Sequence, residues 1–160
     1  DFFYFEMLGD NYHIDEMVGF AWGNAQQIYA SQDINLLQQP AFKEFLGNTA
    51  LKVYDFKRSK VLLSRLGIEL SQPSFDSRLA KYLLSTVDNN EIVTIAGLYG
   101  KTKLAEDEAV YGKGAKRALP EKAILLSHLA KKVTVLVETE QPMTDLLRQH
   151  DQLNHLYEME

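Results

Sequence analysis

The chain has 160 residues, the usual length of one domain with a sizeable core. Its formal net charge of −5 argues against nucleic-acid binding through bulk positive charge. The absence of cysteine excludes a disulfide framework, a zinc knuckle and a thiol nucleophile, and it fits a reducing cytoplasm, while no apolar run approaches the roughly 18 residues of a membrane span.

The first segment, residues 2–8, places six apolar or aromatic side chains around one carboxylate, Glu6. Such a run predicts a strand that is covered on both faces, as in the middle of a sheet. A buried carboxylate is costly unless it is paired. Glu6 therefore belongs either to an active site or to the remnant of one that has acquired a new partner.

Two further strands are predicted over residues 18–22 and 26–30. The Gly23-Asn24 pair between them is typical of a hairpin turn, in which glycine supplies the positive φ. Together with the first segment, these strands predict a three-stranded meander at the beginning of the chain.

The remainder of the chain is predicted to be mainly helical, with Asp55 and Asp76 each capping the start of a helix. One more strand is expected, which makes the whole a mixed α/β domain. The predicted elements are a helix at 41–46, a strand at 49–54, and helices at 55–66, 76–88, 91–99, 120–140 and 143–157.

Residues 100–118 contain three glycines and several basic residues, which predicts a mobile segment. Lys113, Lys116 and Arg117 could contact a phosphate backbone, although the charge pattern alone favours a solvated surface loop. The glycine spacing is not that of a phosphate-binding P-loop. The histidines are scattered without metal-pair spacing, so a polar helix face is the favoured interpretation for them.

The order of elements suggests a ribonuclease H-like sheet, and a resemblance in sequence supports this. Residues 106–120 are similar to the proofreading-domain region of bacterial DNA polymerase I, and the resemblance covers essentially the whole chain. Three more stretches match in the right order: Glu6 with Asn11-Tyr12-His13 and Val18-Gly19, then Gly67-Ile68-Glu69-Leu70 with Ser74-Phe75-Asp76, then Tyr82-Leu83-Leu84.

The resemblance implies where a catalytic site would lie. Active members of this family hold two divalent metal ions with four carboxylates: a D-x-E on the first strand, an aspartate on a helix, and a Y-x-x-x-D on a late helix. Matched to that pattern, only Glu6 keeps its carboxylate. The other positions are occupied by Tyr4, Ser59, His128 and Lys132, and Lys132 reverses the charge.

The resemblance therefore implies a family branch with a degenerate exonuclease site and no metal cofactor, in which Lys132 pairs with Glu6. Residues 1–160 are interpreted as a single 3′–5′ exonuclease-like domain, a fragment of a longer polymerase chain that acts in DNA replication and repair. The expected partners are the polymerase domain of the same chain and, weakly, DNA. A monomer located in the cytoplasm, without a membrane partner, is expected.

Two alternatives remain open at this point. In the first, the domain is an active two-metal 3′–5′ exonuclease that binds Mg²⁺ or Mn²⁺ through Glu6 together with Asp10, Asp55 or Asp76. In the second, the acidic net charge and an exposed final helix make it a protein-interaction module.

Overall fold

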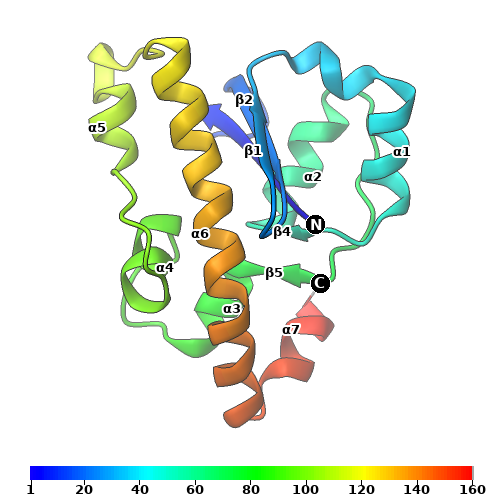
Figure 1. Ribbon diagram of the computed structural model, residues 1–160, viewed down its shortest axis with the longest axis vertical. Coiled ribbons are helices and arrows are strands. Elements are labelled where there is room, and N and C mark those ends of the chain that lie inside the picture. Colours follow the sequence, from blue (N-terminus) through cyan, green and yellow to red (C-terminus); the bar gives the residue numbers. More distant parts are fainter. Residues whose placement is uncertain (160) are drawn as a thin grey trace.

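The computed structural model describes residues 1–159, and a five-stranded mixed sheet lies at its centre (Figure 1). The strand order is β3-β2-β1-β4-β5, with β1, β2 and β3 antiparallel and with β4 and β5 parallel to β1. The predicted meander is thus confirmed. The strands are β1 (Phe2–Leu8), β2 (Glu16–Gly23), β3 (Ile28–Ser31), β4 (Lys52–Val53) and β5 (Phe75–Asp76).

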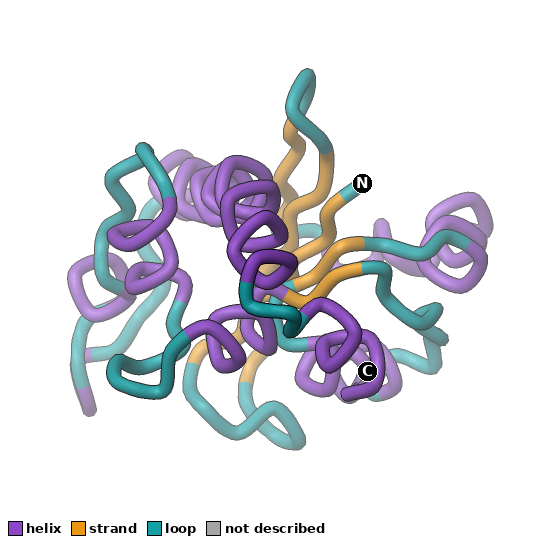
Figure 2. Tube along the Cα trace, turned by 90° about the horizontal axis from the view of Figure 1, so that it is seen from below, coloured by secondary structure: helices purple, strands orange, loops and turns teal. Residues whose placement is uncertain are grey.

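Helices cover both faces of this sheet, as Figure 1 shows from one side and Figure 2 from below. One long helix, α6, lies against one face, and α1 and α2 lie against the other. No helix within residues 1–159 is long and apolar enough to cross a membrane. The helical elements are η1 (Ile34–Gln38), α1 (Pro40–Asn48), α2 (Phe56–Ser64), α3 (Ser77–Leu84), α4 (Ile92–Tyr99), α5 (Asp107–Tyr111), η2 (Gly114–Lys116), α6 (Lys122–Gln149) and α7 (Leu153–Met159).

The alternation of side chains along β1 decides which face receives the carboxylate. Phe3 and Phe5 pack into the core on the side of α1 and α2, whereas Phe2 and Tyr4 pack against α6. Because successive side chains of a strand point to opposite faces, Glu6 lies on the same side as Tyr4. The carboxylate therefore faces the long helix.

Helix α6 approaches the sheet closely beside Glu6, because the residue opposite Glu6 on β2 is Gly19. A Cβ atom at Gly19 would lie 2.8 Å from Cδ1 of Leu129 on α6 and 2.8 Å from the backbone oxygen of Ser31. Real Cβ atoms do not come that close to backbone oxygens. Glycine at this position lets α6, and the side chains that it carries, reach the central strand.

The long helix differs from the prediction at both ends. It begins at Lys122 rather than at Pro120, and it continues through Pro142 to Gln149 instead of breaking there. A proline inside a helix costs about 3 kcal/mol relative to alanine. Met143 and Leu147 follow it and are fully buried, and burial of each such side chain contributes about 1.5–3 kcal/mol. The apolar contacts beyond the proline therefore outweigh the lost backbone hydrogen bond.

The segment 100–118 was predicted to be a mobile loop, and this prediction was wrong in part. It contains the short helices α5 and η2, and α5 packs beside α6. The side chain of Tyr111 at the end of α5 is 5% exposed. Burial of the Tyr111 ring, whose hydroxyl donates to Glu6 on β1, holds the segment against the sheet despite the flexibility of the nearby glycines.

Asp55 and Asp76 both cap helices, as predicted. The carboxylate of Asp55 accepts a hydrogen bond from the amide of Arg58 in α2. Asp76, which is 1% exposed, accepts from the first amides of α3 and also from the amides of Asp55 and Phe56 at 2.9 and 2.8 Å. One buried carboxylate thus holds the beginnings of two helices.

Candidate functional site

A cleft of about 550 Å³ opens beside the end of β1, between α2, α5 and α6. Its lining is strongly ionic, with carboxylates and cations interleaved around a few aromatic rings. The cleft contains the one carboxylate of the central strand. Its lining side chains include Tyr4, Glu6, Arg58, Asp107, Arg117 and Lys132.

The expected ion pair between β1 and α6 forms at the floor of this cleft. Nζ of Lys132 lies 2.5 Å from Oε2 of Glu6, and both side chains are 3% exposed. Burial by itself lowers the pKa of Lys132, but Glu6, Tyr4 and Asp107 together outweigh this effect and hold that pKa well above its ordinary value. Lys132 is therefore a charged ammonium group at neutral pH.

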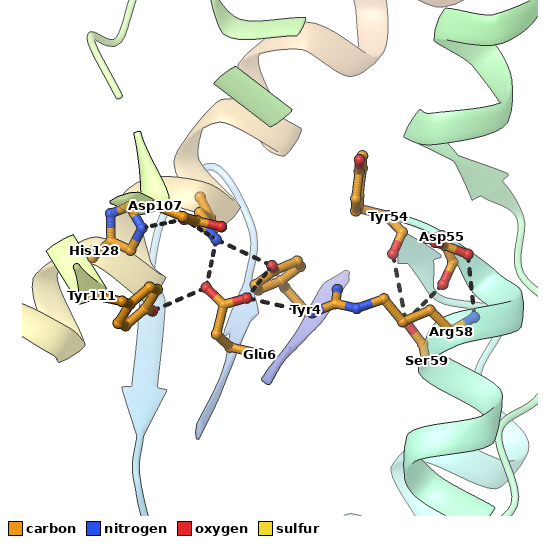
Figure 3. A network of polar contacts seen from close by, with 10 residues as sticks. Tyr4, Glu6, Tyr54, Asp55, Arg58, Ser59, Asp107, Tyr111 and His128 are labelled. Atoms are coloured by element: carbon orange, nitrogen blue, oxygen red, sulfur yellow. Dashed lines mark hydrogen bonds and ion pairs between the residues drawn. The ribbon is translucent and has the colours of Figure 1, made fainter. Parts of the chain in front are cut away.

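Three further groups contact the Glu6 carboxylate (Figure 3). The hydroxyl of Tyr4 donates to Oε1 at 2.6 Å, and the hydroxyl of Tyr111 donates to Oε2 at 3.0 Å. The guanidinium of Arg58 lies 3.4 Å from Oε1. Burial, followed by the nearby Glu6 charge, raises the pKa of Tyr4 to about 12, so its hydroxyl remains a donor. Both carboxylate oxygens already accept hydrogen bonds from this chain.

Asp107 completes the network, and sequence reasoning missed it. Its Oδ1 atom lies 2.8 Å from Nζ of Lys132 and 2.9 Å from Nε2 of His128. Burial raises the pKa of Asp107, but the hydrogen bonds and charges of His128 and Lys132 outweigh this effect and lower it. Asp107 stands in the stretch 106–120 that carries the family resemblance, and that stretch was the only signal in the sequence.

His128 corrects the interpretation of the histidines as residues of a polar helix face. Its side chain is 4% exposed and contacts Asp107 and the ring of Tyr111. The reason is that this face of α6 turns toward the sheet, with α5 covering it. The sequence around His128 does not distinguish it from the other scattered histidines, so its burial could not be predicted.

The remaining predicted positions lie outside the network around Glu6. Ser59 is buried in α2, and its hydroxyl donates to the carbonyl oxygen of Asp55 one turn earlier (Figure 3). Lys113, Lys116 and Arg117 are exposed on and just beside η2. Of these three cations, Arg117 also lines the cleft.

The network is close to electrically neutral, because two carboxylates, Glu6 and Asp107, face two cations, Arg58 and Lys132. Within residues 1–159, the group of metal-ligating side chains found here consists of Glu6, Asp107 and His128, with their ligand atoms within 4.8 Å of one another. The Lys132 ammonium contacts two of these three residues.

The carboxylates that the active-exonuclease alternative requires beside Glu6 do not belong to this group. Asp76 is occupied with backbone amides of α2 and α3, and Asp55 caps α2. Asp10 lines the cleft but does not belong to the group around Glu6. The structure thus gathers a different donor set from the one that this alternative requires.

A mixed sheet with a central carboxylate on its first strand, covered by helices on both faces, defines a ribonuclease H-like domain. Residues 3–139 match the family described as DNA polymerase I, ribonuclease H-like domain, and the chain belongs to that family. The resemblance to the proofreading-domain region of bacterial DNA polymerase I, predicted from short stretches, is thereby confirmed.

A curated relative supports this assignment, and two solved structures share the fold. The chain is 57% identical over 158 residues to DNA polymerase I of Streptococcus pneumoniae R6, covering 99% of the chain and 18% of that protein. A structure described as the apo form of the nuclease matches with a TM-score of 0.76 at 15% identity, over 97% of this chain and 77% of the other. The Pol1 POL domain of M. smegmatis, in complex with DNA primer-template and dNTP, matches with a TM-score of 0.73 at 14% identity, over 97% and 25%.

Proposed function

We propose that this chain is a 3′–5′ exonuclease-like domain that has lost exonuclease activity and supports a neighbouring polymerase domain. The observation that carries the proposal is the position of Lys132, whose ammonium lies between Glu6 and Asp107. An ammonium group has three donors and no lone pair, so it cannot ligate a metal ion. It repels one electrostatically.

Two-metal hydrolysis needs more negative charge than the network around Glu6 offers. Two divalent ions lie about 3.5–4 Å apart in such sites and stabilise both the attacking and the leaving oxygen. Here the two carboxylates of the network are already balanced by Arg58 and Lys132. The residues present therefore do not fit a two-metal centre.

The role of the whole protein is also a proposal, because the chain spans about a fifth of the length of the Streptococcus relative. We infer that the domain belongs to a cytoplasmic polymerase that acts in DNA replication and repair. Within that protein it would be a monomeric structural module whose main partner is the polymerase domain of the same chain.

The first test is a nuclease assay with 5′-labelled single-stranded DNA. The purified chain is expected to leave the 3′ end intact in millimolar Mg²⁺ or Mn²⁺, because Tyr4, Ser59 and Lys132 cannot supply the missing carboxylates. Stepwise shortening from the 3′ end that disappears in Glu6→Ala would show instead that the site is active. Shortening that persists in Glu6→Ala would identify a contaminating nuclease.

Weak binding of single-stranded DNA is the second expectation, through Lys113, Lys116 and Arg117. These cations are exposed and close together in sequence, whereas the whole chain carries a net charge of −5. Contacts to phosphates release counterions, so the affinity should fall steeply between about 50 and 200 mM salt. Fluorescence anisotropy of the wild type and a triple Glu variant measures this, with the exposed Lys43→Glu as the matched control. Submicromolar binding that ignores both salt and the triple variant contradicts the assignment.

A further inference from the structure

Three side chains around Lys132 have the composition of a site for one transition-metal ion. Glu6 comes from β1, Asp107 from α5 and His128 from α6, and their ligand atoms lie within 4.8 Å of one another. The ligand atoms of one tetrahedral ion, each bound at about 2.1 Å, lie about 3.4 Å apart. Movements of up to about 1 Å would bring these three atoms onto one ion.

A positive charge already lies between two members of this group. Nζ of Lys132 lies 2.5 Å from Glu6 and 2.8 Å from Asp107, in a pocket where its side chain is 3% exposed. These two ion pairs are a second observation beside the spacing of the three ligand atoms. They show that the group holds a cation in the folded chain.

Neighbouring hydroxyl groups hold the central carboxylate in place. The hydroxyls of Tyr4 and Tyr111 each donate to one oxygen of Glu6, at 2.6 and 3.0 Å (Figure 3). Such outer contacts orient ligands in metal sites and are commonly worth about 10- to 100-fold in affinity. Nζ of Lys132 also donates to the Tyr4 hydroxyl at 3.2 Å, whereas Tyr111 reaches Glu6 through its own hydrogen bond. We expect the Tyr111 contact to keep Glu6 oriented when the lysine side chain is removed.

We propose that Lys132 is a tethered cation that fills a latent site for a single divalent transition-metal ion, with Glu6, Asp107 and His128 as its ligands. The inference rests on the proposed function, in which the chain itself binds no metal here. Two carboxylates and one imidazole favour Zn²⁺ or Co²⁺ over Mg²⁺, which prefers oxygen ligands only. One ion cannot supply two-metal chemistry, so a loaded site stays inactive toward DNA.

The test removes the ammonium and adds the metal alone. Lys132→Ala is titrated with Co²⁺ at about pH 7.5, where histidine is neutral enough to ligate. The expected results are 1:1 binding by calorimetry, visible d–d absorption, and a Tm that rises by about 5–10 °C when free Co²⁺ is about 100-fold above Kd. Mg²⁺ at the same concentration should leave the Tm unchanged. The wild type and the exposed Lys131→Ala, as matched control, should show none of these responses.

Ligand variants in the Lys132→Ala background assign the site. Asp107→Asn and His128→Gln should each weaken Co²⁺ binding at least about tenfold, the lower end for loss of a supporting contact in a metal site. Asp10→Asn is the matched control, because Asp10 lines the same cleft outside the group, and it should leave the affinity unchanged. The assignment of ligands would be overturned if all three variants weakened Co²⁺ binding equally, or if none of them weakened it.

The experiment still tests the latent site if Lys132→Ala unfolds the chain. Metal binding to a site that exists only in the folded state adds to folding free energy, so Co²⁺ should then restore the far-UV circular dichroism of Lys132→Ala. Lys132→Gln keeps a neutral side chain of similar length and serves as a second variant. A chain that stays unfolded in saturating Co²⁺, or a folded variant that binds none, refutes the latent site. The nuclease assay on the wild type tests the proposed function separately.

Discussion

Replacing Lys132 by methionine is expected to lower the free energy of unfolding by about 3–5 kcal/mol, because it leaves the Glu6 carboxylate buried with too little positive charge. Glu6 is 2% exposed at the floor of the cleft, so we expect its carboxylate to regain little hydration when the ammonium is lost. Methionine has nearly the same length as lysine, so the change removes the charge and leaves the packing almost intact. Urea denaturation followed by circular dichroism measures the loss.

The double-mutant cycle separates loss of the pair from loss of packing. Glu6→Gln together with Lys132→Met should recover much of the loss, with a coupling energy of about 2–3 kcal/mol, at the upper end for directly contacting residues. The matched control is Lys131→Met, an exposed neighbour on the same helix, which should change stability by less than about 0.5 kcal/mol. A coupling energy near zero would mean that the two charges do not stabilise each other.

The contribution of the Glu6–Lys132 pair to the free energy of unfolding should be lost at alkaline pH. The pKa of Lys132 in the folded chain is raised well above 10.5, its ordinary value. A group whose pKa is raised by folding contributes stability that is fully present below the unfolded pKa and is lost as pH rises through the folded pKa. The difference in unfolding free energy between wild type and Lys132→Met should therefore be constant from about pH 7 to 9 and shrink above about pH 10.5. A difference that shrinks already in that lower range would contradict this charge assignment.

Asp76→Ala is the second change with a large expected effect, a loss of about 2–4 kcal/mol. Removing one helix cap costs about 0.5–2 kcal/mol, and this carboxylate serves the first amides of both α2 and α3. Its burial also raises the pKa of Asp76, a cost that the amide of Phe56 partly offsets. Thermal and urea denaturation of the purified variant measures the loss.

Asp76→Asn keeps one acceptor oxygen and removes the buried charge, so it should lose clearly less stability than Asp76→Ala. The exposed Asp88→Ala provides the matched control and should stay within about 0.5 kcal/mol of the wild type. A loss at Asp76→Ala no greater than that of Asp88→Ala would show that the shared cap is energetically unimportant.

Much of the sheet could be predicted from sequence, because β1 to β3 have continuous apolar runs separated by clear turn residues. The strand β5 could not, since it consists of two residues only and the second of them, Asp76, also caps the helix that follows. A helix break at Pro142 was predicted from local chemistry. This prediction was wrong, because burial of Met143 and Leu147 is a tertiary effect. Helix propensities and proline rules describe local sequence only, so they contain no information about the tertiary contacts that bury these two side chains.

The site divides in the same way between local and long-range information. The pairing of Glu6 with Lys132 could be predicted, because the family resemblance assigned both residues to one centre and their charges are opposite. Arg58, Asp107 and Tyr111 were missed, because each reaches Glu6 or Lys132 only through the packing of α2 or α5. Asp107 stands 25 residues before Lys132 in the sequence, and no periodicity connects them.

The separation of 126 residues between Glu6 and Lys132 also has a consequence for the order of folding during synthesis. At about 5–20 residues per second, Lys132 is added roughly 6–25 s after Glu6. The meander of β1, β2 and β3 is complete long before that, but the face that α6 covers stays open to water. During this interval Glu6 keeps its hydration shell, and the sheet cannot bury Phe2 and Tyr4. Docking of α6 is therefore the step that buries this face of the sheet and dehydrates both charges together.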